Sequence, residues 1–299
     1  MHDQQKALSY AITTVLLWST VATAFKLSLG YLSPLQLLFY ACLTSSLTLF
    51  VLIMFTGRFA ILTTLKRHDL KRGVLLGLLN PLLYYLVLFK AYDLLPAQEA
   101  QPINYTWAIT LSLLSVPLLG HRLSRIELLS ILVCYTGVVV IVTHGEPFTL
   151  SFSSLPGVAL ALISTLIWSF YWIYNTRIKL DPVVSLFLNF ITALPLLGLL
   201  MWVTGGFHSI TVEGIAGAVY VGIVEMGVAF VLWLQAMRLT TSTVRIATLI
   251  YFAPFLSLVL IHFLVGEEIL WSSIAGLILI VAGNLIQRGG KPKTASNMP

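Results

Sequence analysis

The stretch Gly222-Ile-Val-Glu-Met-Gly-Val-Ala-Phe-Val-Leu-Trp233 holds a single carboxyl group, that of Glu225, in the middle of an apolar segment. At the centre of a bilayer a charged side chain costs about 2.5–3.5 kcal/mol on insertion scales, so ionisable residues there usually face a cavity or a partner. Two alternatives follow for Glu225. Either its protonated carboxyl group is bonded to a neighbouring helix, because buried polar groups are normally satisfied, or it belongs to a functional site, which we favour.

The composition around this stretch is that of an integral membrane protein. Of the 299 residues, 58% are hydrophobic and 9% are charged, whereas about a quarter of the residues in a soluble protein are charged. The two cysteines, Cys42 and Cys134, lie in apolar segments and indicate neither a disulfide framework nor a metal cluster. The net charge of +6 does not indicate a nucleic-acid partner, because the basic residues are distributed by membrane side.

Ten apolar segments are long enough to cross a bilayer as helices, which takes about 20 residues each. They are residues 7–29, 34–56, 71–92, 97–119, 124–143, 156–178, 182–204, 214–237, 242–264 and 270–287. Apart from 57–70, each connection has only a few residues, which leaves no room for a soluble domain. We therefore expect an all-α membrane protein with ten transmembrane helices.

The basic residues predict the orientation of these helices, since Lys and Arg are enriched in short cytoplasmic loops. Of the 17 Lys and Arg residues, all but Lys26 and Lys90 fall on one side. They are Lys6, Arg58, Lys66, Arg67, Lys71, Arg72, Arg122, Arg125, Arg177, Lys179, Arg238, Arg245, Arg288, Lys291 and Lys293. Ten spans put both termini on that side, so we expect cytoplasmic N and C termini. Lys26 and Lys90 either extend to the outer surface or face the pathway.

The two halves of the sequence resemble each other at a nearly constant spacing, which indicates an internal duplication. The matched motifs are Leu17-Trp18-Ser19 with Ile167-Trp168-Ser169, Ser33-Pro34 with Asp181-Pro182, and Leu111-Ser112-Leu113 with Leu256-Ser257-Leu258. Because each half holds five spans, an odd number, the second half must enter the bilayer in the opposite orientation. We expect two inverted five-helix repeats, 1–147 and 148–299, an arrangement in which transporters bind substrate near the midplane between the halves.

The repeat matches Glu225 with Asn80, 145 positions earlier, so the third and eighth spans carry polar residues near their centres. Aromatic residues are matched in the same way: Trp18 with Trp168, and Trp107 with Phe252. Trp normally lies at the membrane interface. Deep Trp residues therefore either fill helix packing or line a cavity in which a ligand stacks on them.

Two further polar residues adjoin these positions. Tyr84 follows Asn80 by four positions, and Asn104 precedes Trp107 by three, so on regular helices each pair shares a face. These residues extend the candidate site into the third and fourth spans.

The motifs together resemble those of the drug/metabolite transporter superfamily, whose members contain two EamA-type repeats. The resemblance covers residues 1–290. It is carried by Leu17-Trp18-Ser19-Thr20, Trp168-Ser169, Pro34, Pro182, Tyr251-Phe252-Ala253-Pro254 and Gly266-Glu267. With Asn104-Tyr105-x-Trp107 added, the chain is similar to bacterial exporters of aromatic amino acids. The resemblance implies a multi-pass protein of the bacterial inner membrane that exports amphipathic metabolites through a cavity between its halves, and it adds Tyr251 to the site.

We therefore expect a secondary transporter that exports small metabolites, amino acids or related aromatic compounds first among them, by alternating access. Trp18, Trp168 and Trp107 would hold the apolar part of the substrate. The polar groups would be bound by Asn80, Asn104, Tyr84 and Glu225. The carboxyl group of Glu225 is also the candidate for carrying a coupling proton. The expected partners are this substrate and the lipid bilayer, with a homo-oligomer left open, and no cofactor or metal is expected.

Two rival functions use the same sequence features differently. The first is an uncoupled facilitator or channel of the same fold. The second is a membrane-embedded enzyme acting on lipid, against which the sequence offers no His-Glu-x-x-His, no Gly-x-Ser-x-Gly and no paired carboxyl groups within a span. A phosphate-binding Gly-rich loop is missing as well, so the energy for transport would come from a gradient.

Overall fold

The computed structural model describes residues 2–119, 123–146, 148, 152–175, 178–240, 246 and 249–289, and within them the chain is all-helical, as predicted. The first half contains α1 (His2–Leu29), α2 (Pro34–Phe55), α3 (Phe59–Thr63), α4 (Arg67–Gly77), η1 (Leu78–Leu83), α5 (Tyr84–Leu94), α6 (Ala97–Asn104), α7 (Trp107–Leu119) and α8 (Arg125–Val142). The second half contains α9 (Leu155–Asn175), α10 (Pro182–Val203), α11 (Val212–Ile223), η2 (Val224–Ala229), α12 (Phe230–Leu239), η3 (Leu249–Phe252), α14 (Ala253–Leu260), η4 (Ile261–Val265) and α15 (Trp271–Gly289).

The ten predicted spans correspond to these elements, but four of them are composite. The third span is α4, η1 and α5, the fourth is α6 and α7, the eighth is α11, η2 and α12, and the ninth is η3, α14 and η4. Seven described helices are long and apolar enough to cross a membrane, and 249–265 and 271–287 are shorter apolar helices. The predicted ninth span begins at residue 242, and residues 241–245, 247 and 248 lie outside the described part of the chain.

Residues at matched positions begin the second helix of each half. Ser33 accepts a hydrogen bond from the backbone N–H of Gln36 and starts α2, and Asp181 accepts from two backbone N–H groups and starts α10. In both cases proline is the first helical residue, where its missing N–H group is not needed. The repeated Ser/Asp-Pro motif is therefore a pair of helix starts.

The contacts between helices repeat in the two halves. α2 packs on α11 as α10 packs on α4, and α1 packs on α12 as α9 packs on α5. α8 and α15, the last spans of the two halves, pack on each other, as do α2 and α10. If each helix is replaced by its counterpart in the other half, the α2–α11 contact becomes the α10–α4 contact and the α1–α12 contact becomes the α9–α5 contact. The α8–α15 and α2–α10 contacts remain the same. This is the pattern of a two-fold axis relating inverted repeats.

Two matched glycines allow a close approach at the α4–α10 and α2–α11 contacts. Gly77 of α4 lies against the backbone of Asn189 in α10, and Gly222 of α11 lies against the backbone of Ala41 in α2. A Cβ atom at either glycine would overlap the facing carbonyl oxygen. Small residues at such crossings let helix backbones approach closely in membranes, so both halves use the same device.

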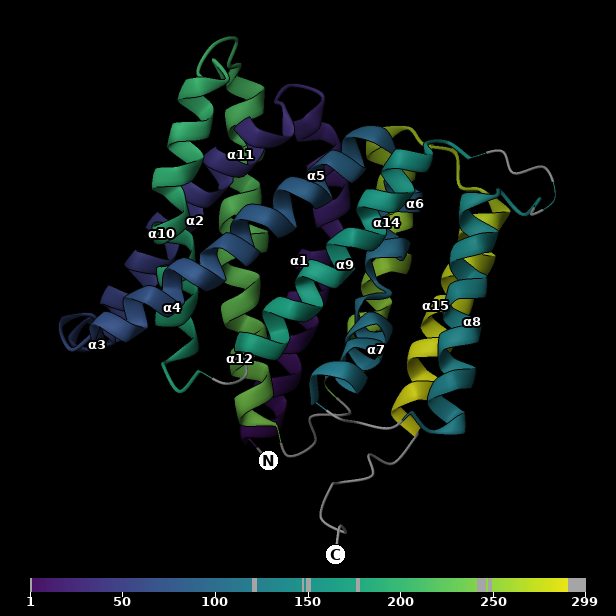
Figure 1. Cartoon of the computed structure of the whole chain (residues 1–299), viewed down its shortest axis with the longest axis horizontal. Helices are drawn as coiled ribbons and strands as arrows, with labels where there is room; N and C mark the ends of the chain where they lie inside the picture. Colours follow the sequence, from purple (N-terminus) through teal and green to yellow (C-terminus); the bar gives the residue numbers. More distant parts are fainter. Residues whose placement is uncertain are drawn as a thin grey trace, which may run out of the picture.

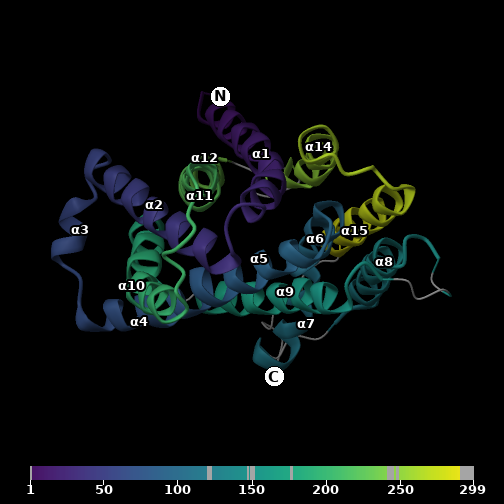
Figure 2. The ribbon, with the colours of Figure 1, turned by 90° about the horizontal axis from the view of Figure 1, so that it is seen from above.

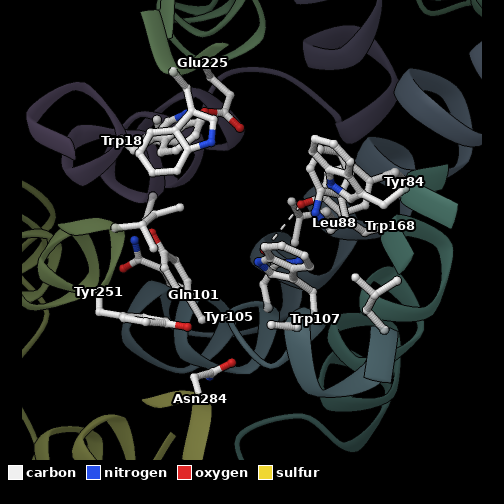
Figure 3. Close-up of a pocket in the computed structure, with 18 of the residues that line it drawn as sticks. Trp18, Tyr84, Leu88, Gln101, Tyr105, Trp107, Trp168, Glu225, Tyr251 and Asn284 are labelled. Carbon is white, nitrogen blue, oxygen red and sulfur yellow. Dashed lines mark hydrogen bonds between the residues drawn. The ribbon is translucent and has the colours of Figure 1, made fainter. Parts of the chain in front are cut away.

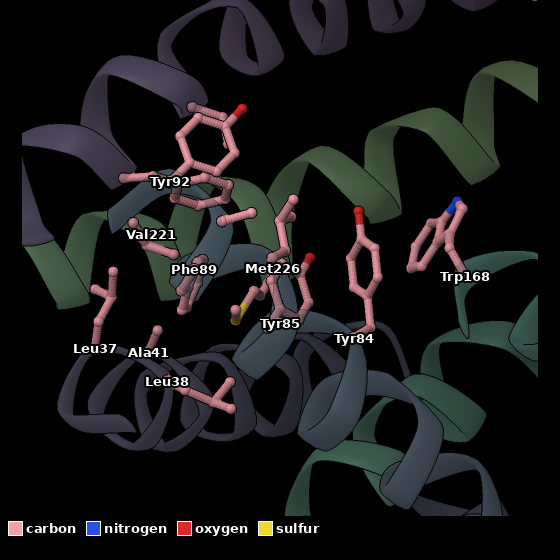
Figure 4. Packing of buried hydrophobic residues seen from close by; sticks show 14 of the residues in the cluster. Leu37, Leu38, Ala41, Tyr84, Tyr85, Phe89, Tyr92, Trp168, Val221 and Met226 are labelled. Carbon is pink, nitrogen blue, oxygen red and sulfur yellow. The ribbon is translucent and has the colours of Figure 1, made fainter. Parts of the chain in front are cut away.

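Figures 1 and 2 show the resulting arrangement, with the α8–α15 pair at one end of the molecule and α2, α10 and α4 at the other. α1 begins and α15 ends on the same face, which we call the terminal end, and the opposite face is the distal end. Side chains from α2, α5 and η2 form part of the core between them (Figure 4), including the fully buried Leu38, Tyr85 and Met226.

Parts of the predicted topology fall on residues that are not described. The division of the repeats after residue 147 lies in 147–151, of which only Phe148 is described. Among the basic residues used to predict the orientation, Arg122, Arg177, Arg245, Lys291 and Lys293 lie outside the described residues.

Candidate functional site

A cavity of about 720 Å³ lies between the two halves of the protein. It runs from Phe25 and Tyr92, near the distal ends of α1 and α5, to Met237 and Gln287, near the ends of α12 and α15 at the terminal end. Its aromatic lining residues are Trp18, Phe25, Tyr84, Tyr92, Tyr105, Trp107, Trp168, Trp172, Phe230, Trp233 and Tyr251. The volume is in the range of small-molecule sites.

The walls of the cavity are built from aromatic rings that contact one another. Tyr84 of α5 stacks on Trp168 of α9, with 4.5 Å between ring centroids and 29° between the ring planes. On the opposite side Trp18 of α1 packs against Trp233 of α12 at 5.4 Å. Phe230 joins the two groups, since it contacts both Trp18 at 5.9 Å and Trp168 at 6.1 Å. Figure 3 shows Trp18 and Trp168 facing each other across the open space.

Glu225 projects from the π-helical turn η2 into this aromatic enclosure. Its Oε1 atom accepts a hydrogen bond from the Tyr85 hydroxyl at 3.1 Å, and the indole ring of Trp18 lies beside the carboxyl group (Figure 3). Among the described lining residues Glu225 is the one charged group. The carboxyl group, which belongs to the second half, is therefore held in position by two side chains of the first half, and Glu225 lines the cavity.

Asn104 fixes the position of the Tyr84–Trp168 stack. Its Oδ1 atom accepts from the Tyr84 hydroxyl at 3.3 Å, and its Nδ2 group donates to the Ser164 hydroxyl at 3.0 Å. Asn104 is the last residue of α6, and the chain turns before α7 begins at Trp107. The Trp107 carbonyl oxygen in turn accepts a hydrogen bond from Ser169 at 3.1 Å. Both ends of this break in the fourth span are thus bonded to α9.

At the distal end α1 closes against the junction of α5 and α6. The rings of Phe25 and Tyr92 meet edge to face at 5.4 Å. The Lys26 ammonium group donates to the carbonyl oxygens of Tyr92 at 2.9 Å and Leu95 at 2.7 Å. These contacts cover the distal end of the cavity on this side, whereas its lining reaches the terminal end.

The loop between the ninth and tenth spans adds a second tie at the distal end. The carboxylate of Glu267 accepts from the backbone N–H groups of Ala97 at 2.7 Å and Gln98 at 3.1 Å, the first residues of α6. A carboxylate at this position also interacts favourably with the positive end of the helix dipole. The Gln98 side chain donates to the Glu268 carbonyl oxygen at 2.6 Å and accepts from Ser273 at 2.9 Å.

Most residues of the predicted site line this one cavity. They are Trp18, Tyr84, Asn104, Trp107, Trp168, Glu225 and Tyr251. Asn80 is not among the lining residues: it is fully buried, and the Tyr171 hydroxyl lies beside it. Its backbone has φ −140° and ψ 113°, which is not helical. The expectation that Asn80 and Tyr84 share a helix face therefore does not hold. Phe252, matched with Trp107, is 60% exposed on the outer surface.

Several lining residues were not predicted from the sequence. Trp172 follows Trp168 by four positions, so helical spacing alone would have added it to the same face. Phe230 and Trp233 follow Glu225, and the turn η2 between them changes the residues that face the cavity. Nothing in the sequence marks Tyr85 as the residue that binds the carboxyl group of Glu225.

Comparison with known proteins places the chain among membrane transporters. A family model, the EamA-like transporter family, matches residues 5–143 and 155–287. A protein of Clostridium kluyveri described as an uncharacterized transporter is 25% identical over 297 residues, covering 97% of this chain and 95% of the relative. One of Archaeoglobus fulgidus with the same description is 24% identical over 276 residues, covering 90% and 94%. A crystal structure with 22% identity and a TM-score of 0.67 covers 95% of this chain and 97% of its own, and so shares the fold.

Proposed function

The chain belongs to the EamA-like transporter family, and from this premise we propose that it is a secondary transporter that exports small amphipathic metabolites across the bacterial inner membrane. As a multi-pass membrane transporter it is not an enzyme. The two repeats, 1–147 and 148–299, would be the units between which the substrate binds. Amino acids and related aromatic compounds form the substrate class proposed first.

One observation carries this proposal: the aromatic cavity between the halves reaches the terminal end, while contacts of Phe25 and Lys26 cover it at the distal end. With both termini in the cytoplasm, as the basic residues suggest, this is a conformation that faces inward. Substrate would enter from the cytoplasm, and a rearrangement of the repeats would then open the distal end. Alternating access of this kind is common among inverted-repeat transporters.

Glu225 is proposed to couple transport to protons, since a carboxyl group in the substrate cavity can exchange a proton for substrate. The test uses proteoliposomes that contain the full chain, radiolabelled phenylalanine or tryptophan, and an imposed pH gradient. We expect the wild type to accumulate substrate against its concentration gradient, and Glu225→Gln to lose both accumulation and the response to the pH gradient. An unchanged rate with unchanged pH dependence in Glu225→Gln would remove Glu225 from the mechanism.

The uncoupled facilitator remains the alternative, and the same vesicles distinguish it. A facilitator would equilibrate substrate and support counterflow, but it would never accumulate substrate when a pH gradient is imposed. Glu213→Gln is the matched control, because Glu213 is an exposed carboxylate in the first turn of α11. We expect this variant to transport at the wild-type rate.

A further inference from the structure

The charges and hydrogen-bonding groups of the cavity point to a narrower substrate class. We propose that the site selects organic monocations, aromatic amines that carry an ammonium group and no carboxylate, over the corresponding amino acids. This inference rests on the proposed function and specifies the substrate of the same site. It is carried by the lining charge, by the surrounding lysines and by the unpaired acceptors of the cavity.

The first observation is the charge of the lining. Glu225 is the one acidic side chain, and no Lys, Arg or His occurs, among the described residues that line the cavity. An ammonium group placed beside Glu225 would be paired. In an α-amino acid the carboxylate is attached to the carbon that bears the ammonium group, so pairing one with Glu225 brings the other close to the same negative charge. Like charges placed together in a binding site oppose binding strongly.

The lysines nearest in the sequence to the lining residues are already bound elsewhere. The Lys26 ammonium group is bonded to the Tyr92 and Leu95 carbonyl oxygens at 2.9 and 2.7 Å. Lys90 is exposed and forms an ion pair with Asp93 on the same helix, with 2.5 Å between Nζ and Oδ2. Neither lysine is available to pair with a carboxylate in the cavity.

Among the buried neutral polar atoms of the described lining, two amide oxygens have no hydrogen-bond partner. Gln101 Oε1 and Asn284 Oδ1 are buried, line the cavity and accept no hydrogen bond from the described residues. One N–H of the Asn284 Nδ2 group donates to the Ile280 carbonyl oxygen at 2.9 Å, and one N–H of the Asn104 Nδ2 group donates to Ser164. Among the buried side-chain nitrogen and oxygen atoms of the described lining, the indole N–H of Trp172 is the donor without a partner. An ammonium group, which has three donors and no acceptor, fits this set better than a carboxylate.

The aromatic rings favour the same charge. A cation within about 6 Å of a ring centroid is attracted by the negative face of the ring, most strongly for Trp. Trp18 lies beside Glu225 on one wall, and Tyr84 and Trp168 form a stacked pair on the facing wall. An aromatic amine can therefore place its ring between these walls with its ammonium group toward Glu225.

Four compounds with one phenyl skeleton and different charge test the proposal. They are phenethylamine and phenylalaninol, both cations, phenylalanine, a zwitterion, and 3-phenylpropionate, an anion. Binding to the full chain in lipid nanodiscs is measured at pH 7 by quenching of tryptophan fluorescence, and uptake is measured in proteoliposomes. We expect both cations to bind about tenfold tighter than phenylalanine, because only phenylalanine places a second negative charge beside Glu225. The anion should bind most weakly.

Variants of the carboxyl group identify the cause of this preference. In Glu225→Gln the affinities of phenethylamine and phenylalanine should become equal within about threefold, because the charge that separates them is gone. Glu225→Asp should keep the preference, and Glu213→Gln, on the exposed surface of α11, should behave as the wild type. Thermal unfolding of each variant establishes that it is folded.

The outcomes separate this inference from the proposed function. If phenylalanine binds and is transported as well as phenethylamine, transport of amphipathic metabolites stands and the selection of monocations is overturned. A cation preference that Glu225→Gln leaves intact would likewise overturn it. If none of the four compounds binds or is transported, the proposed substrate class fails together with the inference.

Discussion

Glu225 is held by side chains from other spans rather than by neighbours on its own helix. The Tyr85 hydroxyl donates to it from α5, at 3.1 Å, and the Trp18 indole lies beside it from α1. A carboxyl group with such partners in hydrocarbon is costly to keep unless it has a function. The same reasoning applies to Asn104, which joins Tyr84 of α5 to Ser164 of α9.

Asn104 yields a prediction at this scale. Asn104→Ala removes the hydrogen bonds to the Tyr84 and Ser164 hydroxyls, of which Ser164 still donates to the Ala161 carbonyl oxygen, so we expect the folded state to lose about 1–2 kcal/mol. Thermal unfolding in detergent measures the effect. The double variant Asn104→Ala, Ser164→Ala should lose less stability than the sum of the two single variants, because both changes remove the same hydrogen bond. If the stability losses of the two single variants simply add in the double variant, the hydrogen bond between Asn104 and Ser164 does not contribute to stability.

Trp168 yields a second prediction. Trp168→Leu removes the ring that stacks on Tyr84 at 4.5 Å, and we expect an aromatic substrate to bind about tenfold more weakly, as fits the loss of stacking on one ring. The matched control is Trp202→Leu, since Trp202 is 74% exposed and is not among the residues that line the cavity. Equal affinities in the two variants would show that Trp168 does not contact substrate.

At the scale of single elements, Gly222 marks a close crossing of two helices. A Cβ atom at Gly222 would overlap the Ala41 carbonyl oxygen, so we expect Gly222→Ala to lower the stability by about 1–3 kcal/mol, as overpacking does. Gly198 of α10 is the control, because a Cβ atom there would lie 3.7 Å from Phe39, an ordinary contact. Gly198→Ala should keep the unfolding temperature or raise it. A tolerated Gly222→Ala would contradict the close approach of α2 and α11.

The sequence predicts long helices better than it predicts their interruptions. Spans such as 34–56 and 182–204 agree with α2 and α10 to one residue, because Ser33-Pro34 and Asp181-Pro182 are local start signals. Pro81 marks an interruption at η1, because proline disfavours the helical conformation at the residue before it, whereas η2 holds no proline. The assumption of regular helices correctly places Trp18 and Trp168 on the cavity. The same assumption places Asn80 and Tyr84 on one helix face, but the backbone at Asn80 is not helical, so the two residues do not share a face.

The matched positions show a second limit of prediction from the repeat. Exchange of the halves relates Trp107 to Phe252, but the cavity is lined by Trp107 and Tyr251. The fourth span is broken between α6 and α7, whereas the ninth, from residue 249 on, starts with the 3₁₀ turn η3. A repeat in sequence therefore fixes which helices meet, while the face each helix presents depends on local breaks.

At the scale of the whole molecule, the hydrogen bonds of Lys26 at the distal end predict that the cavity opens less readily at this end than at the terminal end. Lys26→Met removes the hydrogen bonds to Tyr92 and Leu95, and bonds to charged groups contribute about 1.5–3 kcal/mol each. We expect this variant to populate a conformation open at the distal end at least several-fold more than the wild type does. Lys90→Met, which loses only an exposed pair with Asp93, is the matched control.

Labelling with a membrane-impermeant thiol reagent measures this opening. The reporter is Leu88→Cys, because Leu88 lines the cavity, in a chain whose buried Cys42 and Cys134 are replaced by Ala. Reagent supplied at the distal face should label the Lys26→Met protein several-fold faster than the Lys90→Met protein. The same labelling rate in both would mean that Lys26 does not hold the distal end closed.

The exchange of halves leaves one difference at the centre of the protein: the carboxyl group of Glu225 lies in the cavity, and its counterpart Asn80 lies buried behind it. The inward- and outward-facing forms are therefore not copies of each other, and the half-saturating concentration should differ between the two faces of the membrane. Detailed balance then requires the maximal rates to differ by the same ratio when no gradient is applied. With saturating substrate on one face and none on the other, the protein would act as a rectifier, faster in one direction than in the other.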